Sequence, residues 1–415
     1  MTLRSLAGWL GVLLLTACGG GTAASRALVT VFDSTRADTV VARTAGEVPA
    51  ERVRQLVEEL RIAPEADDTS LFADVFEFDV TPDGRLLVFD QGGRSVLEFA
   101  PGGALTRRIG RQGAGPGEFN RNGGMVARAD GGFVQWDAGN GRVSFFSPSG
   151  NFDSSWVVPT GFSTSNGLRS DRSGSLYLYR PVTPPREGEI LGRMGLVRLQ
   201  PGGVWGDSLV PPDLPWERVV YVARVDGNTS STSPTHSPRF QWQWHPDGHF
   251  VSVSTARYVL EVSRPDRALR IEREAPAIPV SADERAFEEE RITASMRQTE
   301  PGWVFRGPPI PAEKPPVAAL FVARDGRYWV RVATASELIP EAERDPVRPN
   351  RPPPRRYREQ PEYEVFDADG SFRGRVALPM GSTFIEADGD LVWFIARDAD
   401  GLAAVVRARV NPGLR

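Results

Sequence analysis

The three histidines of the chain are its first candidates for chemistry, because imidazole is a common ligand of zinc. They are His236, His245 and His249, and the last two flank the turn sequence PDG. Paired across the tip of a hairpin, two imidazoles could touch one metal ion. The alternative, which we prefer, is that they are solvated loop residues. We therefore assign no metal site and no cofactor. The chain also has no Gly-x-Ser-x-Gly elbow, and we assign no catalytic residue.

Two further motifs resemble ligand-binding loops. Gly110–Gly117 is rich in glycine, but a phosphate-binding loop follows a strand and opens a helix. Pro116 and the glycines beside it prevent a helix, so we interpret this segment as a connector between strands. Residues 367–370 and 398–401 both read Asp-Ala-Asp-Gly. They lack the later acidic ligands of an EF-hand-type calcium loop, and we interpret them as turns.

A single cysteine, Cys18, ends the apolar run near the start of the chain. Arg4 followed by LAGWLGVLLLTA has the basic start and apolar core of a secretory signal. The sequence LTAC resembles the bacterial lipobox, in which the cysteine becomes the lipidated first residue. We predict a lipoprotein signal peptide at 1–17, lipid attachment at Cys18, a lipidated tether at 18–26, and an outer-membrane location consistent with Gly19. A plain secretory signal with an incidental cysteine is the alternative.

Short antiparallel strands are predicted along most of the chain by alternating apolar residues. Between Phe78 and Phe119, four strand-like runs are separated by Asp-Gly or Gly-Gly pairs, which supply the positive φ of tight hairpin turns. A unit of this kind recurs, and its turn glycines are Gly84, Gly131, Gly174, Gly248, Gly326 and Gly389. A repeat of about 40–50 residues with four strands has the size of a propeller blade.

The last unit, 383–410, has three strands, whereas strand-like runs are left over at 27–32 and 38–42. Donating an N-terminal strand to the last blade would complete it and remove an exposed sheet edge. We therefore predict an all-β fold over residues 27–415, a six-bladed β-propeller of four-stranded antiparallel blades closed by an N-terminal strand. A β-sandwich is the alternative, but it does not explain the four-strand period.

Helical spacing occurs in two segments. Pro49–Leu60 places apolar residues on one face of a helix, and Ser281–Gln298 begins with the capping box Ser-x-x-Glu. This second helix and the loops Pro211–Ser237 and Ser336–Gln360 are insertions, which make their units longer than the repeat of about 40–50 residues. The last loop contains the basic, proline-rich run Arg348–Arg358, which we interpret as a solvated insertion because acidic residues precede it. Contact with anionic headgroups or glycans is the alternative.

The segment Ile109–Phe119 reads IGRQGAGPGEF and follows the first strand unit. It resembles the bacterial six-bladed β-propellers related to NHL repeats, which commonly read IGRQGxGPGEF and follow a lipobox signal. The resemblance implies the fold and a place in the cell envelope, but it implies no defined activity. Some NHL-type lyases hold zinc through histidines from different blades. The three histidines here lie in or just before one blade.

A binding scaffold is the function that we expect from the sequence. It would hold a protein or a glycan through loops at one mouth of the ring, reach the membrane through the lipid at Cys18, and be a monomer. The net charge of −4 argues against nucleic acid as a partner. The alternative is a metal-dependent hydrolase or lyase with its site in the central channel. Glu77 and Asp79 would be the first candidates as ligands.

Overall fold

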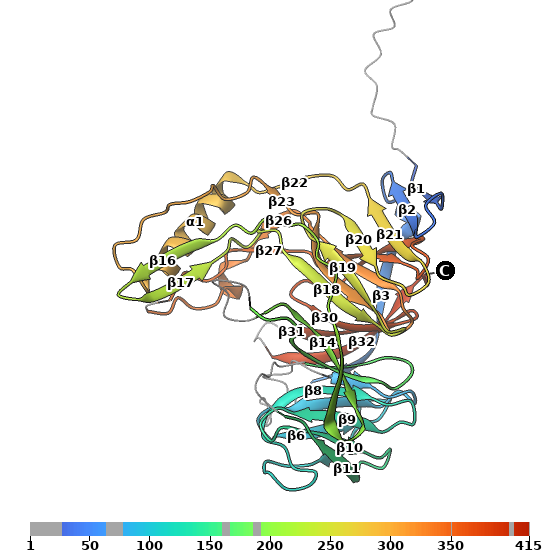
Figure 1. The fold of residues 1–415 in the computed structure, drawn as a ribbon. Helices are drawn as coiled ribbons and strands as arrows, with labels where there is room; N and C mark the ends of the chain where they lie inside the picture. Colours follow the sequence, from blue (N-terminus) through green and yellow to red (C-terminus); the bar gives the residue numbers. More distant parts are fainter. Residues whose placement is uncertain are drawn as a thin grey trace, which may run out of the picture.

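The computed structural model describes residues 27–63, 78–159, 167–185, 192–349, 351–397 and 402–414. Residues 1–26 with Cys18, residue Glu77 and the turn at 398–401 therefore lie outside the described residues. Within these ranges the structure is mostly β-strand, as the sequence predicts, and it contains one α-helix (Figure 1).

Four-stranded antiparallel sheets follow one another along the described chain, and we call them meanders 1 to 6. Meander 1 contains β4 (Phe78–Val80), β5 (Leu86–Asp90), β6 (Ser95–Phe99) and β7 (Leu105–Ile109). Meander 2 contains β8 (Asn122–Ala127), β9 (Phe133–Asp137), β10 (Arg142–Phe146) and β11 (Phe152–Val157). Meander 3 contains β12 (Leu168–Ser170), β13 (Leu176–Pro181), β14 (Met194–Gln200) and β15 (Val204–Leu209).

The second half of the chain repeats this organisation, with insertions between the strands. Meander 4 contains β18 (Phe240–His245), β19 (His249–Ser254), β20 (Val259–Val262) and β21 (Ala268–Arg273). Meander 5 contains β24 (Val317–Val322), β25 (Tyr328–Val332), β28 (Glu362–Phe366) and β29 (Phe372–Ala377). Meander 6 contains β30 (Thr383–Asp388), β31 (Leu391–Arg397), β32 (Ala403–Asn411) and β3 (Val53–Ile62).

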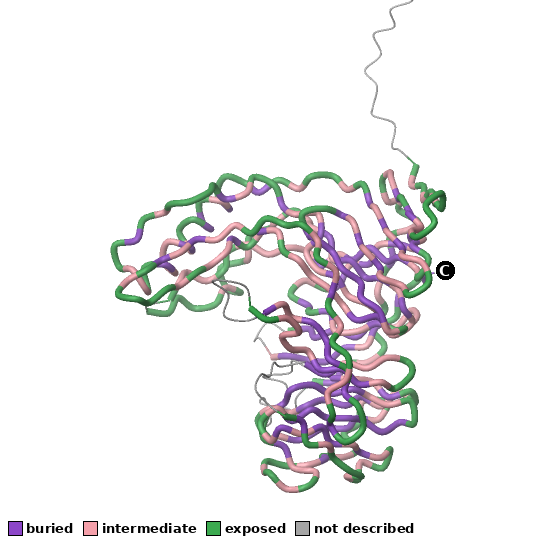
Figure 2. Tube along the Cα trace, in the orientation of Figure 1, coloured by how far each residue is buried: buried purple, intermediate pink, exposed green. Residues whose placement is uncertain are grey.

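The two middle strands of meander 1 are apolar on both faces because the sheet is covered on both sides. The sequences LLVFD and SVLEF of β5 and β6 are buried almost throughout, whereas LTRRI of the outer strand β7 is largely exposed. The turn between β4 and β5 depends on Gly84, whose φ of 84° favours glycine. Middle strands of other meanders, such as β9, β19 and β31, are also buried almost throughout (Figure 2).

Neighbouring meanders pack face to face through shared apolar clusters. Phe89 of meander 1 and Phe133 of meander 2 belong to one such cluster. Meander 6 packs in turn on meander 1, where the rings of Trp393 and Phe78 have centroids 6.1 Å apart. Burial of these faces removes apolar surface from water, which is the main favourable term in folding.

The N-terminal part of the described chain extends two sheets. Strands β1 (Val29–Asp33) and β2 (Thr39–Ala45) confirm the strand-like runs there, but these runs do not complete the last unit as we expected, because β2 pairs in parallel with β21 of meander 4. Strand β3 pairs antiparallel with β32 of meander 6. The first two residues of β3, Val53 and Arg54, also make a short parallel pairing with β29, which joins meanders 5 and 6 into one sheet.

The predicted helix at Pro49–Leu60 is wrong. Only Ala50–Arg52 form a short 3-10 turn (η1), and the rest of the segment belongs to β3. The apolar residues fit helical spacing, but pairing with β32 and packing of Leu60 and Ile62 against meander 1 favour an extended strand. Tertiary pairing overrides a short local pattern of this kind.

The connections that carry the insertions leave the meanders at one end. Antiparallel strands reverse direction at each step, so the links from β15 to β18, β21 to β24 and β25 to β28 share one end of the strands. The turns at Gly84, Gly131, Gly174, Gly248, Gly326 and Gly389 lie at the opposite end. The three predicted insertions therefore belong to one face.

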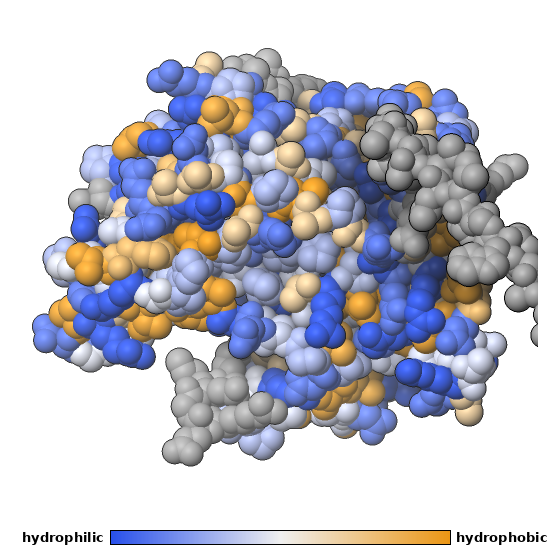
Figure 3. All heavy atoms as spheres, turned by 90° about the horizontal axis from the view of Figure 1, so that it is seen from above, coloured by the Kyte–Doolittle hydropathy of each residue, from blue (hydrophilic) through white to orange (hydrophobic). Residues whose placement is uncertain are grey.

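The insertions build a lobe beside the meanders, at the left of Figure 1. We define this insertion lobe as β16 (Tyr221–Val225), β17 (Asn228–Thr232), α1 (Ala282–Arg297) and residues 298–312. Its small core contains the fully buried Trp303 and Ile292. The indole Nε1 of Trp303 donates a hydrogen bond to the carbonyl of Val222, at 3.1 Å. From above, hydrophobic side chains lie between hydrophilic ones over the lobe (Figure 3).

Short elements complete the described chain. They are η2 (Pro201–Gly203), β22 (Ile278–Pro279), β23 (Glu313–Lys314), β26 (Ser336–Leu338), η3 (Glu341–Glu343) and β27 (Tyr357–Glu359). The hairpin β26–β27 spans the base of the predicted insertion at 336–360 and pairs Ser336 with Glu359. This pairing brings the two ends of the insertion together.

Candidate functional site

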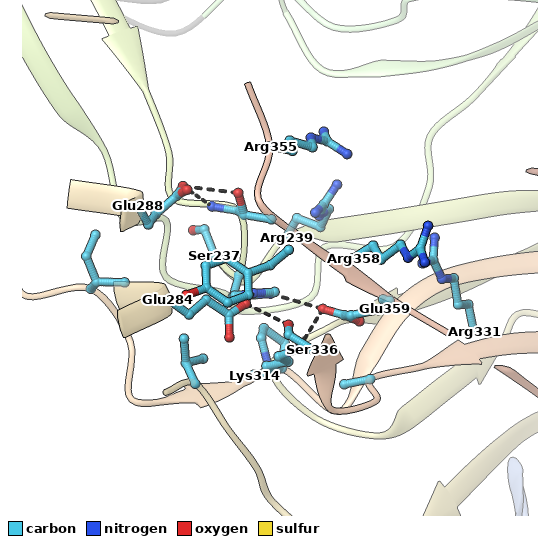
Figure 4. Close-up of a pocket in the computed structure, with 18 of the residues that line it drawn as sticks. Ser237, Arg239, Glu284, Glu288, Lys314, Arg331, Ser336, Arg355, Arg358 and Glu359 are labelled. Atoms are coloured by element: carbon cyan, nitrogen blue, oxygen red, sulfur yellow. Dashed lines mark hydrogen bonds and ion pairs between the residues drawn. The ribbon is translucent and has the colours of Figure 1, made fainter. Parts of the chain in front are cut away.

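The three insertions meet beside meanders 4 and 5 and enclose a pocket of about 400 Å³ (Figure 4). Residues 235–237 line it from the link between β15 and β18, α1 and β23 from the link between β21 and β24, and β26 and β27 from the link between β25 and β28. The sheet contributes Arg331 of β25. We call this cavity the insertion pocket.

A set of polar side chains that we call the buried network ties these insertions together. Lys314 is its centre, with a side chain that is 1% exposed. Its Nζ donates hydrogen bonds to the carbonyl of Thr334 at 2.8 Å, to Oγ of Ser336 at 2.6 Å and to Oε1 of Glu359 at 2.9 Å. Three donors and three acceptors match, as a buried ammonium group requires.

Glu284 and His236 complete the buried network. Ser336 Oγ donates to Oε1 of Glu284 at 2.7 Å, and His236 Nε2 lies 3.0 Å from the same oxygen. The other ring nitrogen, Nδ1, lies 3.6 Å from Glu359 Oε1. Burial by itself raises the pKa of the Glu284 carboxyl, but the hydrogen bonds from His236 and Ser336 and the charge of Lys314 lower it on balance.

The helix that supplies Glu284 begins as the sequence predicts. Ser281 is the N-cap of α1, and its hydroxyl accepts a hydrogen bond from the Glu284 amide at 3.1 Å. The Glu284 carboxylate, which a capping box would turn back toward Ser281, lies instead against His236 and Ser336. The residue at the third helical position thus contributes to the pocket wall.

One turn further along α1, Glu288 fixes the other side of the pocket. Its carboxylate accepts hydrogen bonds from the Thr235 amide at 2.7 Å and from Nη2 of Arg291 at 2.7 Å. Burial raises the pKa of Glu288, but the hydrogen bond and charge of Arg291, with the Thr235 contact, hold it below its ordinary value. These contacts attach α1 to the segment that leads into β18.

Ser336 and Lys314 have the atoms of a nucleophile and a base, but their contacts do not favour that chemistry. Lys314 Nζ donates three hydrogen bonds and so has no lone pair with which to accept a proton. Ser336 donates to Glu284, whose lowered pKa makes it a poor base. The buried network holds the insertions in place.

Arginines dominate the remaining wall of the insertion pocket. Seven basic and three acidic residues line it, and the three carboxylates are engaged by Arg291, by Lys314 and by the His236–Ser336 pair. The other basic lining residues are Arg239, Arg331, Arg355, Arg356 and Arg358. Figure 4 shows the labelled arginines on the side away from α1. The wall carries uncompensated positive charge.

The histidines at 245 and 249 are not the solvated loop residues that we expected. Their rings stack with centroids 4.2 Å apart, and the residues are 2% and 6% exposed. They lie at the turn between β18 and β19, at the end opposite the insertions. Burial, together with the neighbouring His245, lowers the pKa of His249 to about 4. Only His236 reaches the insertion pocket.

Asp79, the described candidate for a channel ligand, is already engaged. The Arg324 guanidinium forms ion pairs with Asp79 and Glu386, and the Ala127 amide donates to Asp79 at 2.5 Å. Its proposed partner Glu77 is outside the described residues. Among the residues that the structure describes, no three His, Cys, Asp or Glu side chains lie close enough to share a metal ion.

Two other interpretations from the sequence are confirmed. Residues 110–121 connect β7 to β8, and Arg142 holds this connector through the carbonyls of Ala114 and Glu118, at 2.9 and 2.7 Å. Asp367 begins a turn in which its carbonyl accepts from the Gly370 amide at 2.9 Å. Its carboxylate accepts from Arg327 Nε at 2.9 Å.

Comparison with known proteins gives likeness in shape alone. No family model and no curated protein matches the chain. An exported protein of Bacteroides fragilis has 10% identity and a TM-score of 0.46, over 90% of this chain and 99% of that one. A DUF4221 member from Bacteroides vulgatus has 11% identity and a TM-score of 0.49, over 87% and 98%. A gluconolactonase of Xanthomonas campestris has 13% identity and a TM-score of 0.37, over 86% and 97%.

The residues that build the insertion pocket were partly foreseeable. The length of the three insertions predicts a binding surface there, but no motif in the sequence marks Lys314 or Arg331 as part of it. Lys314 is the only lysine of the chain, and a single lysine among arginines is a signal that could have been followed. Arg331 lies in an ordinary strand sequence, so only the structure reveals it.

The single α-helix among the described residues, α1, is too short and too polar to span a membrane, and the described chain contains no other candidate.

Proposed function

We propose that the chain is a lipid-anchored, six-bladed β-propeller of the cell envelope that binds a glycan or a protein in the insertion pocket. Each meander would be one blade. Strand β3, which pairs with β32, would close the ring. Packing of meander 6 on meander 1 supports closure, because it leaves each sheet covered by two neighbours. The lipid would be attached to Cys18.

The observation that carries the proposal is the convergence of three insertions on one pocket. Loops of a rigid scaffold tolerate insertions, and long ordered insertions there often serve binding. Three separate connections at one end of the meanders contribute to the insertion pocket. The buried network fixes them to one another at the cost of burying several charges, which an ordinary loop does not need. About 400 Å³ also falls in the usual range for small-ligand pockets.

A substitution that fills the pocket tests this proposal. Ala319 lines the pocket, and Ala319→Trp would occupy it without changing any charge. Ala114→Trp adds the same side chain to the exposed connector between β7 and β8 and is the matched control. The purified full chain in neutral detergent would be applied to an array of envelope glycans and to purified envelope proteins. We expect Ala319→Trp to lose the binding that wild type and control share. Unchanged binding by a correctly folded Ala319→Trp protein would contradict the proposal.

The anchor is tested separately through Cys18. Cys18→Ser should abolish incorporation of labelled fatty acid and move the chain from the membrane fraction to the soluble fraction. Incorporation that persists in Cys18→Ser would contradict a lipid at this residue.

A further inference from the structure

We propose that the insertion pocket recognises an acidic saccharide, and that Arg331 binds the acid group. This inference rests on the function proposed above and specifies the chemistry of its ligand. It starts from the charges that the fold leaves without partners.

Arg331 is the best-placed of these charges. It lies on β25 between the buried residues Val330 and Val332, so the sheet fixes its backbone. Its Nε is buried and has no hydrogen-bond partner among the described residues. Ala319 pairs with Arg331 from the neighbouring strand β24, and this small residue also lines the pocket. A guanidinium that is partly withdrawn from water and unpaired costs stability. Five other described arginines have a buried Nε without a partner, but each of them donates a hydrogen bond through Nη. Arg331 has no side-chain hydrogen bond to any described residue, which leaves its guanidinium available to a ligand.

The surrounding arginines extend the positive wall. Arg239 and Arg355 are exposed, and neither forms a side-chain hydrogen bond or ion pair within the described residues. Arg358 stands nearby on β27, with Nε 2.8 Å from Glu337. Carboxylates outside the pocket thus hold Arg358 in place. A planar guanidinium presents a fork of N–H donors that matches the two oxygens of a carboxylate.

The rest of the lining suits the body of a sugar. Phe287 and Tyr357 provide aromatic surface, with ring centroids 6.0 Å apart. Arg356 covers one of these rings, its guanidinium carbon 4.7 Å from the centroid of Phe287. Thr235 Oγ1 donates to Glu288 Oε1 at 3.1 Å, and its remaining lone pairs can accept a hydrogen bond from a sugar hydroxyl. A peptide of acidic residues alone would satisfy the arginines but has no ring face and no hydroxyl groups to place against this mixed polar and aromatic lining.

Several arginines elsewhere in the molecule are paired with carboxylates and are therefore less suited to bind an acidic ligand. Arg324 at the opposite end is paired with two carboxylates, and Arg273 between meanders 4 and 5 is paired with Glu364. Those charges are neutralised within the fold. The insertion pocket combines a volume of about 400 Å³, several unpaired arginines and aromatic surface. A second pocket of about 410 Å³ has one arginine in its lining, Arg198, which donates to Ser175 Oγ at 2.9 Å.

Titration of the full chain with matched saccharides tests the inference. The probes are tetragalacturonate, its neutral counterpart galactotetraose, and hexaglutamate as an acidic peptide. Binding would be measured by calorimetry in neutral detergent at low and moderate salt, for wild type, Arg331→Gln and Arg36→Gln. Arg36 is exposed between β1 and β2 and does not line the pocket, so its substitution is the control for net charge.

We expect tetragalacturonate to bind wild type and the Arg36→Gln control equally, and Arg331→Gln to bind it roughly tenfold or more weakly, as loss of a charged hydrogen bond requires. Galactotetraose and hexaglutamate should bind far more weakly. Equal loss in both variants would mean nonspecific charge attraction and would overturn the inference. Preference for hexaglutamate would overturn it too. Tight binding of galactotetraose that Ala319→Trp abolishes would overturn the acidic ligand and leave the proposed pocket intact.

Discussion

Several arginines between the meanders are paired with carboxylates, whereas several arginines in the insertion pocket are not. Between meanders 4 and 5, Arg273 and Glu364 form an ion pair at 3.1 Å with side chains that are 2% and 1% exposed. Arg375 adds a second contact to the same carboxylate at 2.7 Å. In the insertion pocket, Arg331 and Arg355 have no acidic partner among the described residues.

This contrast separates charges that hold the fold from charges left available to a ligand. A buried carboxylate with two guanidinium groups has its desolvation offset by pairing, so breaking the set is costly. An unpaired arginine at a pocket wall gains nothing from the folded state. Substitutions in the two regions should therefore have opposite effects on stability and on binding.

The largest effect is expected for Glu364→Gln. It leaves the buried Arg273 without a compensating charge, and the free energy of unfolding should fall by about 3–5 kcal/mol. Denaturant titration measures this change. Glu337→Gln is the control, because Glu337 is half-exposed and pairs only with Arg358, where a loss below about 1 kcal/mol is expected. If Glu364→Gln lowers the free energy of unfolding as little as the control does, the Arg273–Glu364 pair does not stabilise the fold.

Acid should destabilise the chain through His249. Its pKa is about 4 in the folded state, against an ordinary 6.5. The unfolded chain therefore takes up a proton first, and stability falls as the pH drops from about 6.5 toward about 4, by up to about 3 kcal/mol. Above pH 6.5 this histidine should contribute no pH dependence. Thermal unfolding at a series of pH values measures the slope, and His249→Gln should flatten it; an unchanged slope would contradict this assignment.

Ser336→Ala should have an intermediate effect. It removes one hydrogen bond from Lys314 and one to Glu284, so we expect a loss of about 1–3 kcal/mol in the free energy of unfolding. Proteolysis should then cut the insertion at 336–360 faster than it cuts wild type. Resistance equal to wild type would show that the buried network does not hold the insertion.

The smallest effect on stability is expected for Arg331→Gln. Without a partner to lose, the folded chain should change by less than about 0.5 kcal/mol, or become slightly more stable. Denaturant titration next to Glu364→Gln gives the direct comparison. A loss of several kcal/mol would mean that Arg331 is a structural residue.

The sequence predicts much of this fold because its signals are local. Asp-Gly and Gly-Gly turns and alternating apolar residues predict strands at 85–90, 95–100 and 104–110, within about one residue of the bounds of β5, β6 and β7. The Ser281 cap likewise places the start of α1. The sequence predicts that an N-terminal strand completes the last unit, but the segment that does so, β3, has helical spacing. Only its pairing with β32, far away in sequence, makes it a strand.

The site was predictable only as a region. Length identified the three insertions, and strand alternation places them on one face. The side chains that matter come together through contacts far apart in sequence, such as that between Ser336 and Glu284. The burial of His245 and His249 was missed for the same reason, since the packing around a turn decides whether its side chains meet water.

Hydrogen exchange of the full chain, with and without tetragalacturonate, tests the central claim most directly, because it locates ligand protection along the backbone. The account predicts slower exchange in 235–241, in α1 and in β26 and β27, with no change in the turns at Gly84, Gly174 and Gly248. Protection of those turns, or of the strands β4 and β30 in place of the insertions, would contradict a ligand site in the insertion pocket.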